Sequence, residues 1–350
     1  MKSTLLLVKL EKEIAKQIKK IVDSFLEVEM ILAGDIGGTH TRLALFEQGR
    51  LVGREQKFSS RNYSGLEEIV RDYLQIEKRN ISKACFGVAG PVRDGVCKTT
   101  NLPWTIDAAK MGANLDLPVH LLNDLEANAY GLRRLKEEDL VLLQPGKRNQ
   151  KANQALIAAG TGLGEAGLIW DGKKHRPFAC EGGHADFAPR NELEIELFLY
   201  LQKKFGHVSY ERAVSGPGLL SLYQFLIDSG KAVSSARVEA EMERSDPSRV
   251  ISEWGSKNLD RACAEALDLF LSLYGAEAGN LALKFLSLGG LFVGGGIAPH
   301  LVEKLKSGSF VSSFVEKGRF KPLLESIPIW VVLNDDTALL GAAAYGEEGA

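Results

Sequence analysis

Residues that can carry out chemistry stand where short apolar runs of this chain end. The first such place is the segment Gly34-Asp35-Ile36-Gly37-Gly38-Thr39, which follows the apolar run Met30–Ala33. Its glycines leave backbone N–H groups open to anionic oxygens, which can then approach closely. Asp35 offers a carboxylate for the shell of a Mg²⁺ ion, and Thr39 adds a hydroxyl. A hairpin with a purely geometric role also uses glycines, so this segment alone leaves both interpretations open.

Two more glycine clusters follow apolar runs in the same way. Gly160-Thr161-Gly162-Leu163-Gly164 comes after Ala155–Ala159, and Gly294-Gly295-Gly296 comes after Leu291–Val293. Ligands of α/β proteins bind beyond the ends of strands, so three such clusters predict a nucleotide site. The chain lacks the P-loop pattern GxxxxGK followed by Ser or Thr, and it lacks the HRD and DFG motifs of protein kinases. Both of those classes are therefore excluded.

A dinucleotide-binding oxidoreductase is an alternative, because Gly162, Gly164 and Gly167 spell GxGxxG after an apolar run. In that fold a helix begins at the glycines. Here the segment Gly167–Gly172 continues as a strand into a turn, which disfavours the nicotinamide enzyme.

A carboxylate stands where another strand ends, in Leu121-Leu122-Asn123-Asp124, just before the helix predicted at Leu125–Leu135. An aspartate at this place commonly caps the helix or sits in its first turn. It can also act as a general base that accepts the proton of a hydroxyl as its oxygen attacks phosphorus. Asn123 adds a donor and an acceptor beside it. The residues alone leave both roles open.

Polar side chains surround two glycines in Glu181-Gly182-Gly183-His184-Ala185-Asp186. This composition suits a small, hydroxyl-rich ligand better than a packed core. The alternatives are a surface turn, or a metal site formed by Glu181, His184 and Asp186. Glu211 follows, and a turn at Ser215-Gly216-Pro217-Gly218 opens a helix. Taken alone, Glu211 has the character of a solvated surface charge.

Alternating strands and helices predict an α/β protein with mixed sheets. The order of strand, glycine-rich corner, strand and tight turn occurs at 30–49 and again at 155–172, which suggests a duplicated chain with a cleft between its halves. We predict further strands at Lys83–Val88, Val119–Leu122, Leu291–Val293 and Ile329–Leu333. We predict helices at Tyr63–Leu74, Leu125–Leu135, Glu192–Phe205, Gly218–Leu226, Leu259–Leu286 and Ala338–Tyr345. The serine-rich stretch Ser229–Asp260 has the composition of a loop.

Composition narrows the class of protein. The chain has 350 residues, with 43 Lys and Arg against 45 Asp and Glu, and this balance argues against a protein that coats nucleic acid. No apolar run approaches the ~18–20 residues of a membrane helix. Its four cysteines are scattered and form no CxxC pair, which suits a reducing cytoplasm. Residues 1–30 are predicted to form an amphipathic helical extension. It would dock on the protein surface or bind a partner or a membrane. Alternatively, translation starts naturally at Met30 and this extension is not part of the protein.

In their order, these motifs resemble the bacterial-type glucokinases of the hexokinase and actin-like ATPase superfamily. The resemblance covers about residues 31–350 and rests on Gly34–Thr39, Asn101-Leu102-Pro103-Trp104, Asn123-Asp124, Gly160–Gly164, Glu181–His184 and Glu211 with Ser215–Gly218. It implies a duplicated actin-like (ribonuclease H-like) α/β fold with two domains around a cleft. The smaller domain would comprise 31–134 and 335–350, and the larger 135–334.

The resemblance also implies roles for the matching residues. Asp124 would remove the proton of the glucose 6-hydroxyl in an ATP-dependent phosphorylation, the first step of glycolysis. The sugar hydroxyls would be bound by Asn123, Asp124, Glu181, His184 and Glu211. The first phosphate loop would be Gly34, Asp35, Ile36, Gly37, Gly38 and Thr39, with Asp35 near Mg²⁺ through water. The second would be Gly160, Thr161, Gly162 and Gly164, with Gly294, Gly295 and Gly296 facing the adenosine.

Two departures from related families have consequences. His40 stands where relatives often have Asn, and the zinc-binding cysteines of the ROK sugar kinases are absent, with only Cys180 near His184. The chain thus resembles the non-ROK group, whose Mg²⁺ arrives with ATP. A sugar-sensing regulator without transferase activity is a further alternative, although the N-terminal residues show no second helix for DNA binding. We expect glucose as partner, no nucleic acid or membrane, a possible homodimer by analogy, and a cytoplasmic location.

Overall fold

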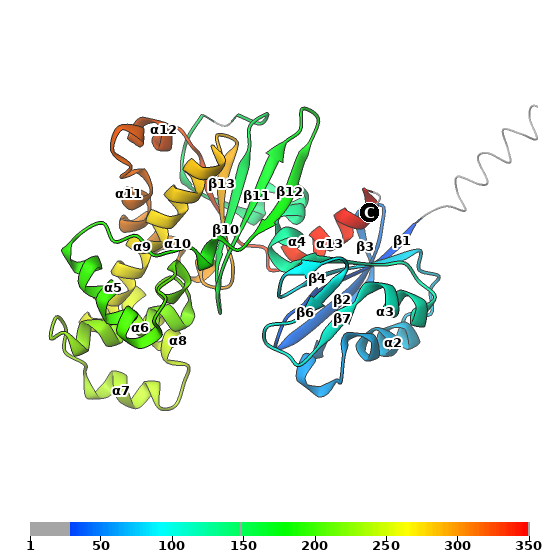
Figure 1. Ribbon diagram of the computed structural model, residues 1–350, viewed down its shortest axis with the longest axis horizontal. Coiled ribbons are helices and arrows are strands. Elements are labelled where there is room, and N and C mark those ends of the chain that lie inside the picture. Colours follow the sequence, from blue (N-terminus) through cyan, green and yellow to red (C-terminus); the bar gives the residue numbers. More distant parts are fainter. Residues whose placement is uncertain (1–28, 148, 349–350) are drawn as a thin grey trace, which may run out of the picture. The chain divides into compact units, whose positions relative to one another are not determined.

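The computed structural model describes residues 29–147 and 149–348. The chain divides into two compact units, of which the first comprises residues up to Ala127 together with those from Ala338 onward. The second unit is Asn128–Thr337. Each unit has its own main sheet (Figure 1). The amphipathic extension predicted at residues 1–30 falls almost wholly outside the described residues. Within them, no helix is long and apolar enough to span a membrane.

The main sheet of the first unit has the strand order β3-β2-β1-β4-β8. Antiparallel hairpins connect the first three strands, whereas β1, β4 and β8 run parallel. The bounds are β1 Met30–Ile36, β2 His40–Glu47, β3 Arg50–Ser59, β4 Lys83–Val88 and β8 Val119–Asn123. A separate small sheet contains β5 Val92–Arg93, β6 Val96–Lys98 and β7 Thr105–Asp107.

Both faces of this first sheet are covered, which explains why Ile31–Gly34 in its central strand β1 are all buried. Leu32 and Ile36 of β1 share a cluster with Ile69 of α2 (Leu66–Ile76) and Met111 of α3 (Ala108–Leu115). Ile31 and Ala33 point to the opposite face, where they pack with Leu339, Ala342 and Ala343 of α13 (Thr337–Glu347).

The second unit repeats this arrangement and adds one strand. Its strand order is β12-β11-β10-β13-β14-β9, with antiparallel hairpins through β10, β11 and β12 and parallel pairing of β10, β13 and β14. The bounds are β9 Leu140–Gln144, β10 Gln154–Ala159, β11 Leu163–Trp170, β12 His175–Cys180, β13 Gly290–Gly294 and β14 Ile329–Val332. Three antiparallel strands followed by two parallel ones occur in both sheets, so the predicted duplication is confirmed.

Helices build the core of the second unit around α9 (Arg261–Phe285), which is buried along most of its length. The N-terminus of α9 is capped by Asp260, whose carboxylate accepts a hydrogen bond from the Cys263 N–H at 3.0 Å. Further helices of this unit include α5 Glu192–Phe205, α6 Gly216–Asp228, α10 Val302–Lys306, α11 Ser309–Val315 and α12 Lys321–Glu325. Helix α4 (Asp124–Gly131) follows β8 directly.

The prediction of a loop at Ser229–Asp260 is wrong. This stretch contains α7 (Ala236–Met242) and α8 (Pro247–Ser256). Ser235 caps α7 through the Val238 N–H, and Asp246 caps α8 through the Arg249 N–H. The Ser, Asp and Pro content that indicated a loop therefore marks the beginnings of two short helices.

The unit boundaries fall at 127/128 and 337/338, within α4 and at the first residue of α13. The boundaries implied by the family resemblance, 134/135 and 334/335, lie a few residues from these positions. The chain passes from one unit to the other along helices α4 and α13, so no polar linker marks either boundary in the sequence.

Candidate active site

The parallel strands of the first unit bring three loops to one edge of its sheet. Ile36, Val88 and Asn123 are neighbours across β1, β4 and β8. The residues that follow these strands therefore share the carboxyl edge, where ligands of α/β proteins bind. These residues include the first glycine turn and Asp124, so the structure brings these two predicted features together.

The first glycine segment divides into a strand end and a turn. Gly34, Asp35 and Ile36 belong to β1, while Gly37, Gly38 and Thr39 form the turn to β2. A Cβ on Gly34 would lie 2.5 Å from Cδ1 of Phe86, so this glycine is needed for packing. The Gly37 N–H donates to the His40 carbonyl at 3.0 Å, which closes the turn through the backbone of the unusual His40.

Ser60 and Asn101 secure this turn, and the sequence predicted neither role. The buried Ser60 hydroxyl donates to the Gly37 carbonyl at 2.8 Å, and its N–H donates to the Thr39 carbonyl at 3.0 Å. A Cβ on Gly38 would lie 2.6 Å from Cβ of Asn101. The sequence signal for Asn101 was its place in a family motif, but Ser60 had none, because its contact spans two strands.

Asp35 is paired with Arg42. The Arg42 Nη2 and Nε groups donate to Oδ2 of Asp35 at 2.8 and 3.2 Å, and 25% of the Asp35 side chain is exposed. The two residues face each other across the β1–β2 hairpin. Their pairing follows from the alternation of side chains on antiparallel strands once the centre of the turn is known. The arginine orients the carboxylate while part of its surface stays open to solvent.

Asn123 is the capping residue of α4. Its Oδ1 accepts hydrogen bonds from the N–H groups of Leu125 at 2.9 Å and Glu126 at 3.3 Å, and its Nδ2 donates to the Gly90 carbonyl at 3.2 Å. Asp124 is the first helical residue, and its Oδ1 accepts from the Leu125 N–H at 2.9 Å. The capping role left open for Asp124 thus belongs mainly to Asn123.

A glycine lets this helix approach the sheet closely. A Cβ on Gly87 in β4 would lie 2.7 Å from Cβ of Ala127 and 3.9 Å from Cα of Asp124. Gly87 therefore helps to set the position of Asp124 at the sheet edge.

The second and third glycine clusters meet in the second unit. The Gly160 N–H donates to the Gly162 carbonyl at 2.8 Å and forms the turn from β10 to β11, while Gly164 already lies in β11. Gly295, with φ of 80°, lies against the Ala159 carbonyl, where a side chain would not fit. A Cβ on Gly160 would meet nothing closer than the Gly296 nitrogen at 3.9 Å, and one on Gly296 would meet nothing within 4 Å. A ligand can approach these backbones closely.

The GxGxxG pattern of Gly162, Gly164 and Gly167 does not form the turn of a dinucleotide-binding motif. Ala159 and Leu163 are paired across an antiparallel hairpin, and Gly164 and Gly167 lie in strand β11. No helix begins there, so the pattern does not build a dinucleotide-binding turn.

Glu211 joins the second turn to His184. Its Oε2 accepts the Leu163 N–H at 2.9 Å, and its Oε1 lies 3.9 Å from Nδ1 of His184. The Ser215 hydroxyl donates to the Glu211 carbonyl at 2.8 Å, and the N–H of Gly216 at the start of α6 donates to the Gly160 carbonyl at 2.8 Å. Four separately predicted motifs are thereby gathered at one place.

Close packing explains the glycine pair next to His184. A Cβ on Gly182 would collide with the Glu165 carboxyl, and one on Gly183 would collide with the Leu163 carbonyl. Glu181 is exposed and its carbonyl accepts the His184 N–H at 3.1 Å. Both side chains are therefore presented on a turn that lies tightly on β11.

The metal-site alternative does not match this geometry. Asp186 Oδ1 lies 2.8 Å from Nε2 of His207, so Asp186 has a different partner from His184. Residues 29–147 and 149–348 contain no group of three His, Cys, Asp or Glu side chains placed to hold a metal ion.

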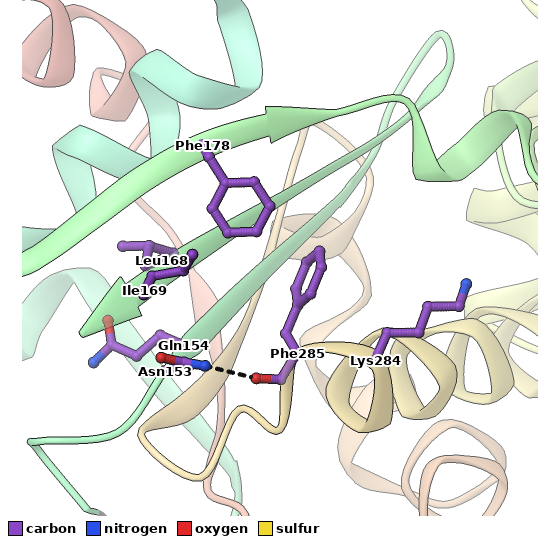
Figure 2. A pocket seen from close by; sticks show the side chains of 7 residues that line it. All are labelled: Asn153, Gln154, Leu168, Ile169, Phe178, Lys284 and Phe285. Carbon is purple, nitrogen blue, oxygen red and sulfur yellow. Dashed lines mark hydrogen bonds between the residues drawn. The ribbon is translucent and has the colours of Figure 1, made fainter. Parts of the chain in front are cut away.

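A small pocket of about 200 Å³ lies elsewhere in the second unit (Figure 2). Its lining includes Asn153 and Gln154 at the amino end of β10, with Phe178, Lys284 and Phe285. The Asn153 Nδ2 group donates to the Phe285 carbonyl at 3.0 Å. Because the glycine clusters lie at the opposite, carboxyl end of β10, this pocket is not part of the candidate site.

Comparison with known proteins shows that the chain is similar to glucokinases. The profile of the glucokinase family matches residues 32–349. The chain is 42% identical to a glucokinase of Trichormus variabilis over 337 residues, which covers 90% of this chain and 98% of the relative. It is 36% identical to a glucokinase of Tolumonas auensis over 321 residues, covering 91% of this chain and 97% of the relative.

Solved structures agree with this result. The structure of glucokinase from an Antarctic psychrotroph superposes with a TM-score of 0.80 at 30% identity, covering 92% of this chain and all of that one. A ROK family glucokinase from Streptomyces griseus, solved with glucose and AMPPNP, has the same fold with a TM-score of 0.64 at 21% identity, covering 91% of this chain and 100% of that one. The predicted two-domain actin-like fold is thus confirmed, and this chain belongs to the glucokinase family of ATP-dependent sugar kinases.

Proposed function

We propose that this chain transfers the γ-phosphoryl group of ATP to the 6-hydroxyl of glucose, as the first step of glycolysis, with Asp124 as the general base. The observation that carries the proposal is the place of Asp124. It lies at the carboxyl edge of the first sheet, the edge that also carries the first glycine turn. A base and a phosphate-binding turn on one edge suit a reaction that depends on positioning.

The immediate neighbours of Asp124 support this role. The Leu125 N–H orients one carboxylate oxygen, and Gly87 allows the helix that carries Asp124 to lie close to the sheet. A base with a fixed orientation accepts the hydroxyl proton as the oxygen attacks the phosphorus atom. Removal of that proton makes the oxygen a stronger nucleophile.

Five residues are assigned to the sugar. Asn123 and Asp124 come from the first unit, and Glu181, His184 and Glu211 from the second. Carboxylates accept hydrogen bonds from sugar hydroxyls, and the amide of Asn123 has one N–H beyond that given to Gly90. The contact network of His184 and Glu211 supports a shared ligand, because both side chains are held at the same place.

The glycine turns are assigned to the nucleotide. Gly37, Gly38 and Thr39 would bind phosphate in the first unit. Gly34, Asp35 and Ile36, at the end of β1, would position this turn. Gly160, Thr161 and Gly162 would do so in the second, next to the N-terminus of α6, which favours anions. The open space above Gly160 and Gly296 fits a nucleotide, with Gly294 to Gly296 facing the adenosine.

Asp35 is assigned to Mg²⁺, through a bound water. A partly exposed carboxylate oriented by Arg42 is a suitable oxygen donor for this ion. When bound with ATP, Mg²⁺ neutralises charge on the phosphates and orients them. The role of Arg42 is to hold Asp35 in one direction.

A cytoplasmic location is also proposed. All four cysteines are free thiols, and Cys85, Cys97 and Cys263 are buried. Unpaired cysteines suit a reducing compartment, where glucose phosphorylation would supply glycolysis.

Replacement of Asp124 tests the proposal. We expect Asp124→Asn to lower kcat by about 10²–10⁴-fold, because the amide cannot accept the proton. Glucose affinity, measured by calorimetry, should change much less, because the amide still hydrogen-bonds the sugar. ADP release is followed in a coupled assay over several hexoses, with Asp116→Asn, on an exposed turn of the first unit, as control. Normal turnover in Asp124→Asn would show that this residue is not the base.

A further inference from the structure

Two glutamates inside the second unit have no part in the proposed function. Glu165 on β11 has 1% of its surface exposed, and Glu277 on α9 is fully buried. Glutamates are almost never fully buried unless they are paired, because removal of the charge from water is costly. The pair therefore requires an explanation in terms of protonation and of position.

The charge of Glu277 is compensated by its neighbours. Lys284 Nζ lies 3.3 Å from its Oε1, and Asn280 Nδ2 donates to its Oε2 at 2.8 Å. Oδ1 of Asn280 accepts in turn from Lys317 Nζ at 2.6 Å. Glu277 thus has a cation and an amide donor that can compensate a negative charge.

Glu165 lacks such compensation. Its Oε1 has no hydrogen-bond partner in the part of the chain that the structure describes. Burial raises the pKa of Glu165 well above its ordinary value, and the negative charge of Glu277 raises it further. Lys284 acts in the opposite sense but is bound to Glu277. Glu165 is therefore the protonated member at neutral pH.

The side chain of Glu165 lies directly beneath the turn that carries two of the sugar-binding residues. There is no room for a Cβ on Gly182, because Oε2 of Glu165 occupies that place. Glu165 also faces Cys180 across the β11–β12 pair, and its carbonyl accepts the Cys180 thiol at 3.4 Å. Glu181 and His184 flank the Gly182-Gly183 pair, and Gly182 contacts the Glu165 carboxyl. A movement of that carboxyl would therefore be transmitted to both side chains.

We propose that Glu165 is a positioning residue for the sugar, whose neutral carboxyl, held against Glu277, supports Gly182 and sets the directions of Glu181 and His184. This inference rests on the proposed function, since it requires Glu181 and His184 to bind glucose. Loss of the proton from Glu165 would place two negative charges together in a medium of low dielectric. The carboxylate would then move toward water and displace the turn above it, and glucose would bind more weakly.

Other ionisable groups around Glu165 do not produce the same response. The groups that interact electrostatically with Glu165 are Glu277, Lys284 and Tyr274 on α9 and Cys180 on β12. Glu181 in turn interacts with Cys180. Burial raises the pKa of the Tyr274 phenol and of the Cys180 thiol, which keeps both neutral at mildly alkaline pH. We therefore assign a proton lost in that range to Glu165.

Steady-state kinetics of two variants test this role. The KM for glucose, the KM for ATP and kcat are measured from about pH 6.5 to 9 for wild type, Glu165→Gln and Glu165→Ala. We expect the wild-type KM for glucose to rise several-fold toward pH 9 with little change in the KM for ATP. Glu165→Gln, which stays neutral, should match wild type at pH 7 and lack the alkaline rise. Glu165→Ala, which removes the support, should raise the KM for glucose about ten- to a hundredfold at every pH.

Ile169→Ala is the matched control, because Ile169 lies on the same strand and is half exposed. An alkaline rise in Glu165→Gln equal to that of wild type would overturn the inference, as would an unchanged KM for glucose in Glu165→Ala. If Glu165→Ala does not fold, as judged by thermal melting, the pH profile of Glu165→Gln decides alone. A wild type that does not phosphorylate glucose would instead refute the proposed function. Calorimetric binding of glucose at pH 7 and 9 would still test the positioning role.

Discussion

The two glycine turns have the same topology, but different groups hold them. Each turn joins a central strand to its antiparallel neighbour, β1 to β2 in the first unit and β10 to β11 in the second. The Ser60 hydroxyl secures the first turn, whereas the Glu211 carboxylate secures the second. Ser60 has no proposed role toward the sugar, but Glu211 has one. Under the proposed function, the residue that holds the second turn would also bind the sugar, whereas Ser60 would only hold the first turn.

The two units also differ in their buried charged side chains. Among the residues that the structure describes, the buried charged side chains are Glu165, Glu194 and Glu277, and all three belong to the second unit. Glu194 is paired with Arg190 at 2.6 Å, and Glu277 with Lys284 at 3.3 Å. Two of these three carboxylates have a cation beside them, and Glu165 is the one without such a bonded partner in the described part of the chain.

Among changes to the residues that hold the two turns, the largest effect is expected from Glu211→Ala. This change removes a charged acceptor from the Leu163 N–H and a proposed ligand of the sugar, so kcat/KM should fall about a hundredfold for both glucose and ATP. Glu211→Gln keeps a carbonyl oxygen for Leu163 and should restore the KM for ATP while that for glucose stays high. Steady-state kinetics with each substrate varied in turn measure both. A loss confined to glucose in Glu211→Ala would show that the second turn does not depend on Glu211.

Gly296→Ala sharpens the assignment of the third glycine cluster. The added methyl group would enter open space, so the free energy of unfolding should change by less than about 0.5 kcal/mol. The same methyl group would occupy space proposed for the nucleotide, and the KM for ATP should rise about tenfold. Gly295→Ala is the contrasting variant, because its φ of 80° and the Ala159 carbonyl make any side chain costly. It should lower the melting temperature, while Gly296→Ala should not.

Ser60→Ala tests the anchor of the first turn. Loss of the buried hydroxyl leaves the Gly37 carbonyl without this donor, which should destabilise the protein by about 1–3 kcal/mol. The KM for ATP should rise about threefold through a looser turn. The KM for glucose should stay within twofold of wild type, in contrast to Glu211→Ala. Equal increases in the KM for ATP and the KM for glucose would contradict the idea that Ser60 serves nucleotide binding but not sugar binding.

The smallest effect concerns Lys317, a half-buried residue of the second unit. Burial, with Arg190 nearby, lowers the pKa of Lys317 to about 8. Between that value and its ordinary pKa of 10.5, the unfolded chain holds a proton that the folded protein has lost. The free energy of unfolding therefore rises with pH across this window, and the gain disappears as pH falls through about 8.

Urea unfolding of wild type and Lys317→Met at several pH values measures this dependence. The difference between the two proteins should increase in favour of wild type by about 1 kcal/mol from pH 8 to 10. A difference that stays constant over this range would show that Lys317 titrates as it does in water.

Strand ends and helix caps could be predicted because their causes are local. Strand β4 at Lys83–Val88 and helix α5 at Glu192–Phe205 have the predicted bounds. The loop predicted from Ser229 onward is wrong because a helix cap and a loop use the same residue types, and only the next few residues distinguish them. Asn123 took the capping role expected of Asp124 for a similar reason, since either side chain can accept the same N–H groups.

The order of motifs along the chain determined by itself the family and the residues that could bind sugar and nucleotide, because these depend on residue type and short spacing. Only the tertiary structure decided that Ser60 secures one turn and Glu211 the other, and that Glu165 lies between Glu277 and Gly182. The physical reason is that the protonation and orientation of a buried group depend on neighbours that are distant in sequence. Their positions become defined only when the sheets and helices pack.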